Sequence, residues 1–365
     1  MTTHDRYSSV VPHETWDVPM AGEARFTWEY DDGRERLLAL YAKGKAKQWD
    51  SATRLDWSEE VDPYNATGVP EQLVPIYGSP TWERLDERGR QELGQHLTAW
   101  QFSQFLHGEQ GAAICAARIV ESVPDLDAKL YAATQVVDEA RHAETYARFL
   151  QEKVQLLYPI NPYLQALLKD TLTDSRWDMP YLGMQVLIEG VALAAFGMLR
   201  ETATHPLAKS ILAYVMQDEA RHVAFGRLAL RDYYAELTDA ERGEREDFVV
   251  EGCYLLRDRF TGREVWETLG FDVQECVDFV DASEMMRAYR NLLFTRIVPI
   301  VKDIGLWGEK IQKAYADMGV LDYAAIDIDA IMRDDERVAD EIDERKRVQA
   351  RADEIHLTIA AGAEA

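Results

Sequence analysis

Two copies of one short motif carry the residues that are best suited to chemistry. The sequence DEARH at residues 138–142 recurs at residues 218–222, an offset of 80 residues, and the same offset carries Glu109 onto Glu189. In each copy the Glu and His are three residues apart, so on a helix both side chains leave the same face. The repeated unit is therefore a helix with a central Glu, followed by a helix with Glu-x-x-His.

Carboxylates and imidazoles at this spacing predict a site for two metal ions. The expected ligands are Glu109, Glu139, His142, Glu189, Glu219 and His222. They fall on apolar helix faces, where an ionised Glu is costly unless its charge is compensated. Four carboxylates and two divalent cations sum to zero charge, and two neutral imidazoles complete the coordination. Such an oxygen-rich set with one His per metal favours iron or manganese over structural zinc.

The residues beside these ligands are candidates for supporting hydrogen bonds. A metal-bound His usually donates its second N–H to an acceptor such as a carboxylate. Asp138 and Asp218 are the expected acceptors, and Arg141 and Arg221 could hold them in place. For the two arginines, a surface ion pair three residues apart is an equally good interpretation. A single Glu-x-x-His would be weak evidence for a metal site, but two equally spaced copies on apolar faces are strong.

The spacing of apolar residues predicts an all-α protein. We expect four helices at about 91–121, 125–154, 178–203 and 206–236, in a four-helix bundle in which two helices give one Glu and two give Glu-x-x-His. Further helices are expected near 34–48, 243–268, 273–297, 300–318 and 333–355. The predicted organisation is a loop-rich arm with a short helix (1–90), the bundle (91–236), additional helices packed on it (237–332), and a charged helix and tail (333–365).

Composition excludes several classes of protein. The net charge of −25 argues against a nucleic-acid partner, and 47% hydrophobic with 29% charged residues is a globular balance. Three widely spaced cysteines predict neither a disulfide framework nor a thiolate metal site, and favour the cytoplasm. The N-terminal sequence lacks the basic start and apolar stretch of a signal peptide.

One apolar segment, residues 181–199, is long enough to cross a membrane. It is apolar except for Gln185 and Glu189. A carboxylate in the middle of a membrane span is expensive. The alternative is a helix that is apolar all round because it lies inside a bundle, and we therefore expect no membrane association.

The paired motifs resemble those of the ferritin-like di-iron carboxylate superfamily over residues 91–236. Its members include bacterial multicomponent monooxygenase hydroxylases, acyl-carrier-protein desaturases, arylamine N-oxygenases and the ribonucleotide reductase small subunit. The resemblance implies O2 activation at two ferrous ions, with electrons from a reductase or ferredoxin; a Mn/Fe pair is the alternative to Fe/Fe. It assigns Glu109, Glu139 and His142 to one iron and Glu189, Glu219 and His222 to the other, some carboxylates bridging. A homodimer is common in the superfamily.

The chain departs from two groups of members and matches a third at one position. Monooxygenases and desaturases place a Thr one turn after the third-helix Glu, where this chain has Ala192 and Leu193. Arylamine N-oxygenases add a His one turn before the second Glu-x-x-His, where this chain has Val215. Tyr146 stands where the reductase small subunit has its radical tyrosine, although a packed core tyrosine is the more common role.

The leading functional hypothesis is an oxidase or oxygenase that hydroxylates, N-oxidises or desaturates a small organic substrate. Small residues beside the ligands, Ala112, Ala113, Ala116 and Gly190, could leave room for substrate near Leu193, or could reflect ordinary close helix packing. The alternatives are a radical-generating subunit that uses Tyr146 and a protein of iron oxidation and storage.

Overall fold

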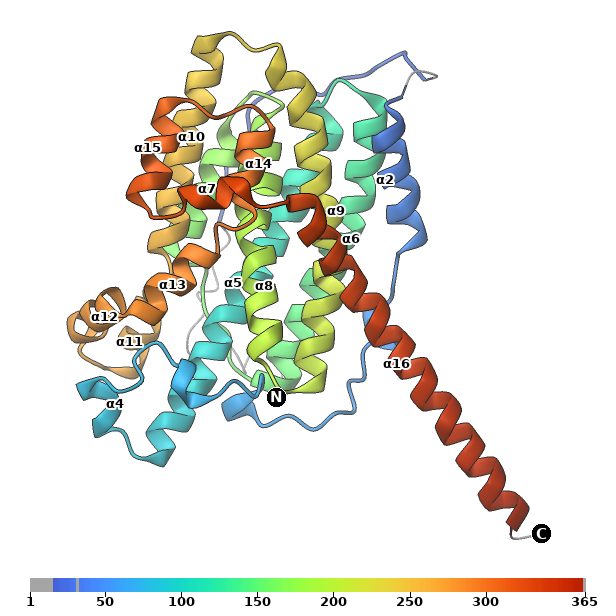
Figure 1. Ribbon diagram of the computed structural model, residues 1–365, viewed down its shortest axis with the longest axis vertical. Coiled ribbons are helices and arrows are strands. Elements are labelled where there is room, and N and C mark those ends of the chain that lie inside the picture. The colour runs from blue at the N-terminus through green and yellow to red at the C-terminus, as the bar shows by residue number, and fades with distance from the viewer. Residues whose placement is uncertain (1–15, 31–32, 364–365) are drawn as a thin grey trace.

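The computed structural model describes residues 16–30 and 33–363, and every regular element within these ranges is helical (Figure 1). Residues 1–15, to which the signal-peptide prediction refers, and residues 364–365 of the predicted tail lie outside the described residues. The prediction of an all-α protein is confirmed.

Four long helices form the central bundle: α5 (Glu87–Ser122), α6 (Leu126–Phe149), α8 (Glu189–Thr202) and α9 (Pro206–Ala235). α5 packs along α6, and α8 packs along α9. The π-helical turns of η3 (Leu150–Val154) extend α6, and those of η4 (Tyr181–Ile188) lead into α8. π-helical turns inside longer helices are often found at functional sites, and η4 ends directly before Glu189.

Helices around the bundle complete the fold (Figure 1). They are α2 (Glu35–Ala46), α3 (Ser51–Arg54), α4 (Pro80–Arg84), α7 (Pro162–Thr173), α10 (Asp239–Asp258), α11 (Arg263–Leu269), α12 (Val273–Ala282), α13 (Glu284–Leu292), α14 (Ile297–Asp303), α15 (Glu309–Asp317) and α16 (Ile328–Ala363), with short 3₁₀ turns η1 (Pro63–Asn65), η2 (Glu71–Leu73) and η5 (Leu321–Ala325). α2 packs on α6 and α9, and the first turns of α16 cross α9 before the helix runs away from the bundle.

The region after the bundle is more broken than the sequence predicted. The expected helix at 243–268 divides at Gly262, whose φ of +70° lies in the left-handed region that favours glycine. The expected helix at 273–297 ends and restarts at Ser283, which caps α13 by accepting the Met286 N–H. The expected helix at 300–318 breaks at Gly305, with φ of +87°. In contrast, α7 was not predicted, although Asn161 caps it and Pro162 opens it.

The apolar segment lies in the core, as the sequence predicted. The helical stretch Tyr181–Thr202 is long and apolar enough to cross a membrane, but 83% of its most apolar window is buried inside the protein. Bundle helices cover it, and the Glu189 side chain at its centre faces other polar groups of the core rather than lipid.

A buried ion pair fixes the entry to this segment. The Asp178 carboxylate, just before η4, accepts hydrogen bonds from Arg245 Nε and Nη2 of α10 at 3.0 and 3.1 Å, and from the Tyr234 hydroxyl of α9 at 3.0 Å. The Asp178 side chain is 1% exposed and that of Arg245 is 4% exposed. Asp178 is thus the buried partner of Arg245, whose Nη1 atom also lies 3.6 Å from the exposed carboxylate of Glu244.

Asp178→Ala is expected to lower the free energy of unfolding by about 3–5 kcal/mol, because it leaves the Arg245 guanidinium buried without its partner. Denaturant unfolding followed by circular dichroism measures the change. The matched control is Glu92→Ala, which removes the exposed Arg88–Glu92 pair and should change stability by less than about 0.5 kcal/mol. Equal losses in the two variants would show that the Asp178 network contributes nothing special.

Candidate metal centre

The six predicted ligands meet in the interior of the four-helix bundle. Glu109 lies on α5, Glu139 and His142 on α6, Glu189 at the start of α8, and Glu219 and His222 on α9. No side chain of the six is more than 6% exposed. The helical spacing of three within Glu-x-x-His places each Glu and His on the inward face of its helix.

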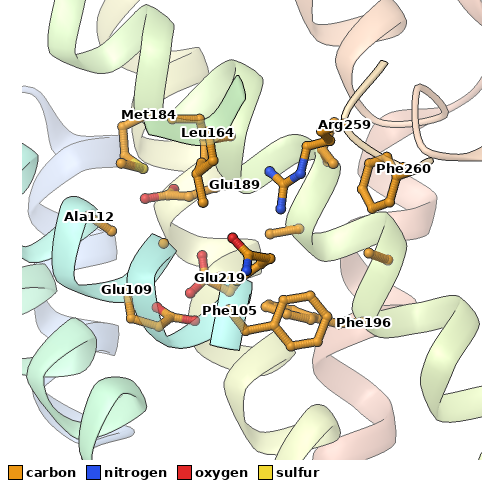
Figure 2. A pocket seen from close by; sticks show the side chains of 16 residues that line it. Phe105, Glu109, Ala112, Leu164, Met184, Glu189, Phe196, Glu219, Arg259 and Phe260 are labelled. Atoms are coloured by element: carbon orange, nitrogen blue, oxygen red, sulfur yellow. The ribbon is translucent and has the colours of Figure 1, made fainter. Parts of the chain in front are cut away.

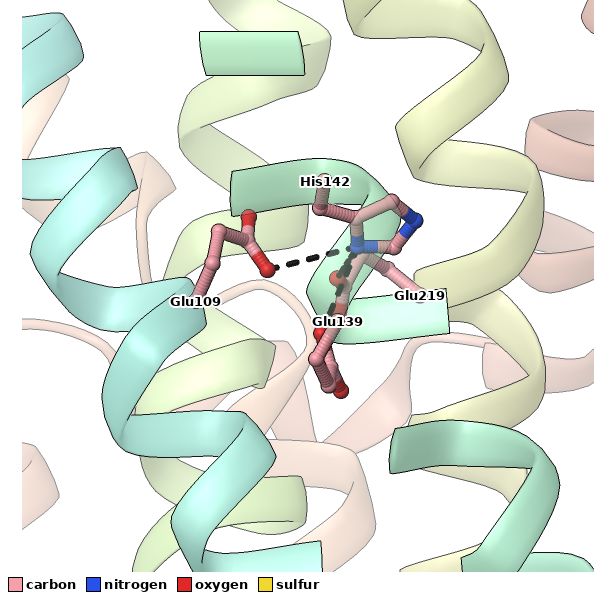
Figure 3. Close-up of side chains that lie close together, drawn as sticks. All are labelled: Glu109, Glu139, His142 and Glu219. Atoms are coloured by element: carbon pink, nitrogen blue, oxygen red, sulfur yellow. Dashed lines mark hydrogen bonds and ion pairs between the residues drawn. The ribbon is translucent and has the colours of Figure 1, made fainter. Parts of the chain in front are cut away.

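The ligand atoms form two overlapping groups. One contains Glu109, Glu139, His142 and Glu219, and the other contains Glu139, Glu189, Glu219 and His222, with one oxygen or nitrogen of each residue within 4.8 Å of the others in its group. In the first group, His142 Nδ1 lies 3.3 Å from Glu109 Oε2 and 3.1 Å from Glu219 Oε1 (Figure 3). Glu139 and Glu219 belong to both groups, so both ions, when bound, would share these two carboxylates.

The two aspartates of the repeated motif contact the histidines in a crossed arrangement. His142 Nε2 of α6 donates to Asp218 Oδ2 of α9 at 3.0 Å. His222 Nε2 of α9 donates to Asp138 Oδ2 of α6 at 3.2 Å. Each imidazole is therefore held by a carboxylate of the other half of the repeat, with its Nδ1 atom turned toward the glutamates.

The two arginines of the motif are buried among these aspartates rather than lying on the surface. Arg141 Nη2 donates to Asp218 Oδ2 at 2.8 Å and also contacts Asp138. Arg221, with its side chain fully buried, contacts Asp218 and lies 3.6 Å from Asp138. Because both side chains are buried, the interpretation of the two arginines as surface ion pairs is wrong. Each of the four buried charges in this network lies beside an opposite charge, as burial requires.

Residues that the motif did not indicate complete this network. Trp49 Nε1 donates to Asp218 Oδ2 at 2.7 Å, and Gln48 Nε2 donates to Asp138 Oδ1 at 2.7 Å. On the other side of the cluster, Gln135 Nε2 donates to both Glu139 Oε1 and Glu189 Oε1 at 2.9 Å. The spacing of four between Gln135 and Glu139 was a usable signal in the sequence, whereas nothing local marked Trp49 or Gln48.

Burial and mutual repulsion dominate the electrostatics of the cluster. Burial, followed by repulsion from Glu219, raises the pKa of Glu189 and of Glu109 well above the usual value. Burial by itself would lower the pKa of His142, but Glu109 and the surrounding carboxylates raise it well above the usual value. Burial and repulsion thus favour the protonated forms of Glu109 and Glu189, and neighbouring carboxylates favour that of His142, so protons compete with metal ions for these atoms.

The donor set fits two divalent metal ions. Glu139 Oε2, Glu189 Oε2, Glu219 Oε2 and His222 Nδ1 are buried and have no hydrogen-bond partner among the described residues. Unpaired polar atoms of this kind are expensive in a protein core, and four of them facing one small space indicate that a ligand satisfies them. Oxygen-rich groups with one imidazole each suit iron or manganese.

A pocket opens beside the carboxylates (Figure 2). Its cavity volume is about 40 Å³, and Glu109, Glu189 and Glu219 form one side. The remaining wall is largely apolar, with aromatic and small residues that include Phe105, Gly108, Ala112, Ala192, Ala195 and Phe196. Such a wall excludes water and suits a flat, apolar ligand.

The other residues singled out from the sequence have varied positions. Ala113 and Leu193 do not line this pocket, and Gly190 packs on Ile297. Tyr146 is fully buried against Phe102 and Phe105, and its hydroxyl has no hydrogen-bond partner among the described residues. The radical role of Tyr146 stays a prediction.

Solved structures show the same fold. R2-like ligand-binding oxidase, with an aerobically reconstituted metal cofactor after photoconversion, aligns with a TM-score of 0.51 at 15% identity, over 77% of this chain and 96% of that one. A variant of that oxidase with an aerobically reconstituted Mn/Fe cofactor gives the same values. No curated protein matches the chain.

The sequence profile of p-aminobenzoate N-oxygenase AurF matches residues 30–305, which cover most of the arm, the bundle and most of the additional helices. Val215, where the sequence departs from arylamine N-oxygenases, is fully buried in the hydrophobic core. With the profile match spanning the whole cluster of carboxylates and histidines, the chain belongs to the p-aminobenzoate N-oxygenase AurF family and is a di-metal oxygenase of ferritin-like fold.

Proposed function

We propose that the protein N-oxygenates a small aromatic amine at a pair of iron ions. The proposed ligands are Glu109, Glu139, His142, Glu189, Glu219 and His222. The observation that carries the proposal is the position of the pocket, which brings an apolar, aromatic-walled space directly against three of these carboxylates. The family description names an arylamine as the substrate of its members, and a flat ring fits such walls.

When bound, the two metal ions supply O2 activation. The residues of the chain hold the ions, exclude water and position the amine. The overall reaction takes an amine, O2, two electrons and two protons to a hydroxylamine and water. One oxygen atom forms the new N–O bond, and the other leaves as water. A reductase or ferredoxin is the proposed source of the electrons.

Further parts of the proposal concern the metal pair and the assembly. We favour Fe/Fe, with Mn/Fe as the alternative, because oxygen-rich sites with one imidazole per ion suit both metals. The buried, unpaired thiols of Cys115, Cys253 and Cys276 agree with a cytoplasmic protein, and the proposed assembly is a homodimer.

The decisive experiment combines metal content with the fate of oxygen. The protein is loaded anaerobically with Fe(II), its metals are counted, and p-aminobenzoate, a reductant and ¹⁸O2 are added. We expect about two irons per chain and an N-oxygenated product that carries ¹⁸O, detected by mass spectrometry. A stable tyrosyl signal in electron paramagnetic resonance without product would instead support the radical role of Tyr146, and a large spherical assembly filled with iron would support storage.

Gly108→Leu separates substrate binding from metal binding. A Cβ atom added at Gly108 would meet nothing within 4 Å, so a larger side chain there extends into the pocket that Gly108 lines. The variant should retain two metals and lose turnover of the amine. Full turnover in this variant would show that the substrate binds elsewhere.

A further inference from the structure

Arg259 is a buried cation that neither the proposed metal site nor the proposed reaction uses. It follows the last residue of α10, in the turn that leads to α11, and it lines the pocket. Only 7% of the residue is exposed. Figure 2 shows its guanidinium group pointing inward, toward the space that the carboxylates of Glu189 and Glu219 also border.

Arg259 has no counter-ion among the described residues. No acidic side chain there forms an ion pair with it, and its Nε atom has no hydrogen-bond partner. Its close contact is the Phe260 ring, 5.0 Å from the guanidinium carbon. The other arginines in the core differ, since Arg221 and Arg245 each contact an aspartate. A buried charge without compensation is rare in proteins because water is lost and nothing replaces it.

The guanidinium nevertheless carries its charge at neutral pH. Burial lowers the pKa of Arg259 to about 10, and the nearby Tyr289 and Glu264 partly oppose the shift. Glu264 is engaged elsewhere, because Asn161 donates a hydrogen bond to it. The positive charge and the free N–H groups of Arg259 therefore remain available to a ligand.

We propose that Arg259 is the residue that binds the acid group of an aminobenzoate substrate, the kind of substrate that the family description names. The guanidinium fork matches the two oxygens of a carboxylate. An aminobenzoate would place its acid against Arg259 and its ring between apolar walls, with the amine toward the metal ligands. This inference rests on the proposed function for the identity of the amine. The binding of the acid group depends only on Arg259.

The test compares an acid with its neutral isostere. Binding of benzoate and benzamide to the metal-loaded protein is measured by calorimetry, alongside the KM for p-aminobenzoate and p-aminobenzamide. In Arg259→Gln, the Kd for benzoate and the KM for p-aminobenzoate should rise about 10–100-fold, while both amide values stay within about twofold. The matched control is Arg263→Gln, four residues on, whose side chain is 54% exposed and should leave all four values unchanged.

A second variant separates recognition from structure. Arg259→Met removes the buried charge and keeps an unbranched side chain, so the variant should fold with undiminished thermal stability and show the same loss of benzoate binding. Weakening of acid and amide by equal factors, or no change for either, would overturn the proposal. Benzoate binding that depends on Arg259, in a protein that oxidises no arylamine, would uphold the anion site and refute the proposed function.

Discussion

Replacing Glu219 by alanine is expected to leave a folded protein that binds fewer than two metal ions per chain and has lost its O2-dependent activity. Glu219 belongs to both groups of ligand atoms, so its loss would take one possible ligand from each of the two proposed ions. With two divalent cations bound, the three remaining carboxylates would leave a net positive charge in a buried site. The fall in activity should exceed the ~10–100-fold typical of losing a supporting hydrogen bond.

The same change should not harm the metal-free protein. Glu219 raises the pKa of Glu109 and Glu189 by repulsion, after the larger effect of burial, so its removal relieves the apo core. Plasma mass spectrometry counts the metals, and thermal unfolding of both apo proteins gives the stability. Glu109→Ala is the matched control, because the group around His222 stays intact and should still hold one ion. Two ions in Glu219→Ala would refute the bridging position of this carboxylate.

Asp218→Asn is expected to have the second largest effect, on both metal affinity and stability. The Asp218 carboxylate accepts hydrogen bonds from His142 Nε2, Trp49 Nε1 and Arg141 Nη2. Burial by itself would raise the pKa of Asp218, but His142, Arg221 and Arg141 lower it well below the usual value, so it is ionised. Asparagine keeps the shape of the Asp218 side chain but removes its charge. Asp138 then compensates the guanidinium groups of both Arg141 and Arg221.

We expect affinity for the ion beside His142 to fall about 10–100-fold, because the imidazole loses the partner that orients it. Stability should fall by about 3–5 kcal/mol, the range for breaking a buried charge pair. Competition with a chelator gives the affinity, and denaturant unfolding gives the stability. Asp247→Asn, whose side chain is 65% exposed beside Lys310, should alter neither quantity appreciably. Matching effects in the two variants would contradict this role of Asp218.

The repeat made the bundle and the cluster predictable. Glu-x-x-His places both side chains on one face of a helix, and each copy follows a helix with a central Glu. Two equally spaced copies therefore predicted four helices whose ligand-bearing faces meet. The burial of Arg141 and Arg221 was less predictable, since a spacing of three fits a surface ion pair and an internal one equally well. Their partners include Asp residues of the opposite helix, and that pairing depends on tertiary contacts.

Residues without a motif were beyond the reach of the sequence. Trp49 precedes α3 in the arm, far along the chain from Asp218, and joins the network only because α2 packs on α6 and α9. No motif marks Arg259, which falls inside the helix expected at 243–268, whereas in the structure it follows the last residue of α10 and lines the pocket. The breaks at Gly262 and Gly305 follow from left-handed backbone at positions that a helical pattern tolerates in a sequence.

The crossed contacts between aspartates and histidines make the two halves of the repeat mutually dependent. His142 is oriented by Asp218, and His222 by Asp138, so neither pair of helices orients its own imidazole. A single helical hairpin with one central Glu and one DEARH motif would contain metal ligands but no aspartate placed to orient its histidine. Such a hairpin, whether an ancestor of this chain or a designed miniature, would have to pair with a second copy of itself before holding either metal. Duplication and fusion would then turn an encounter between two molecules into a permanent arrangement within one.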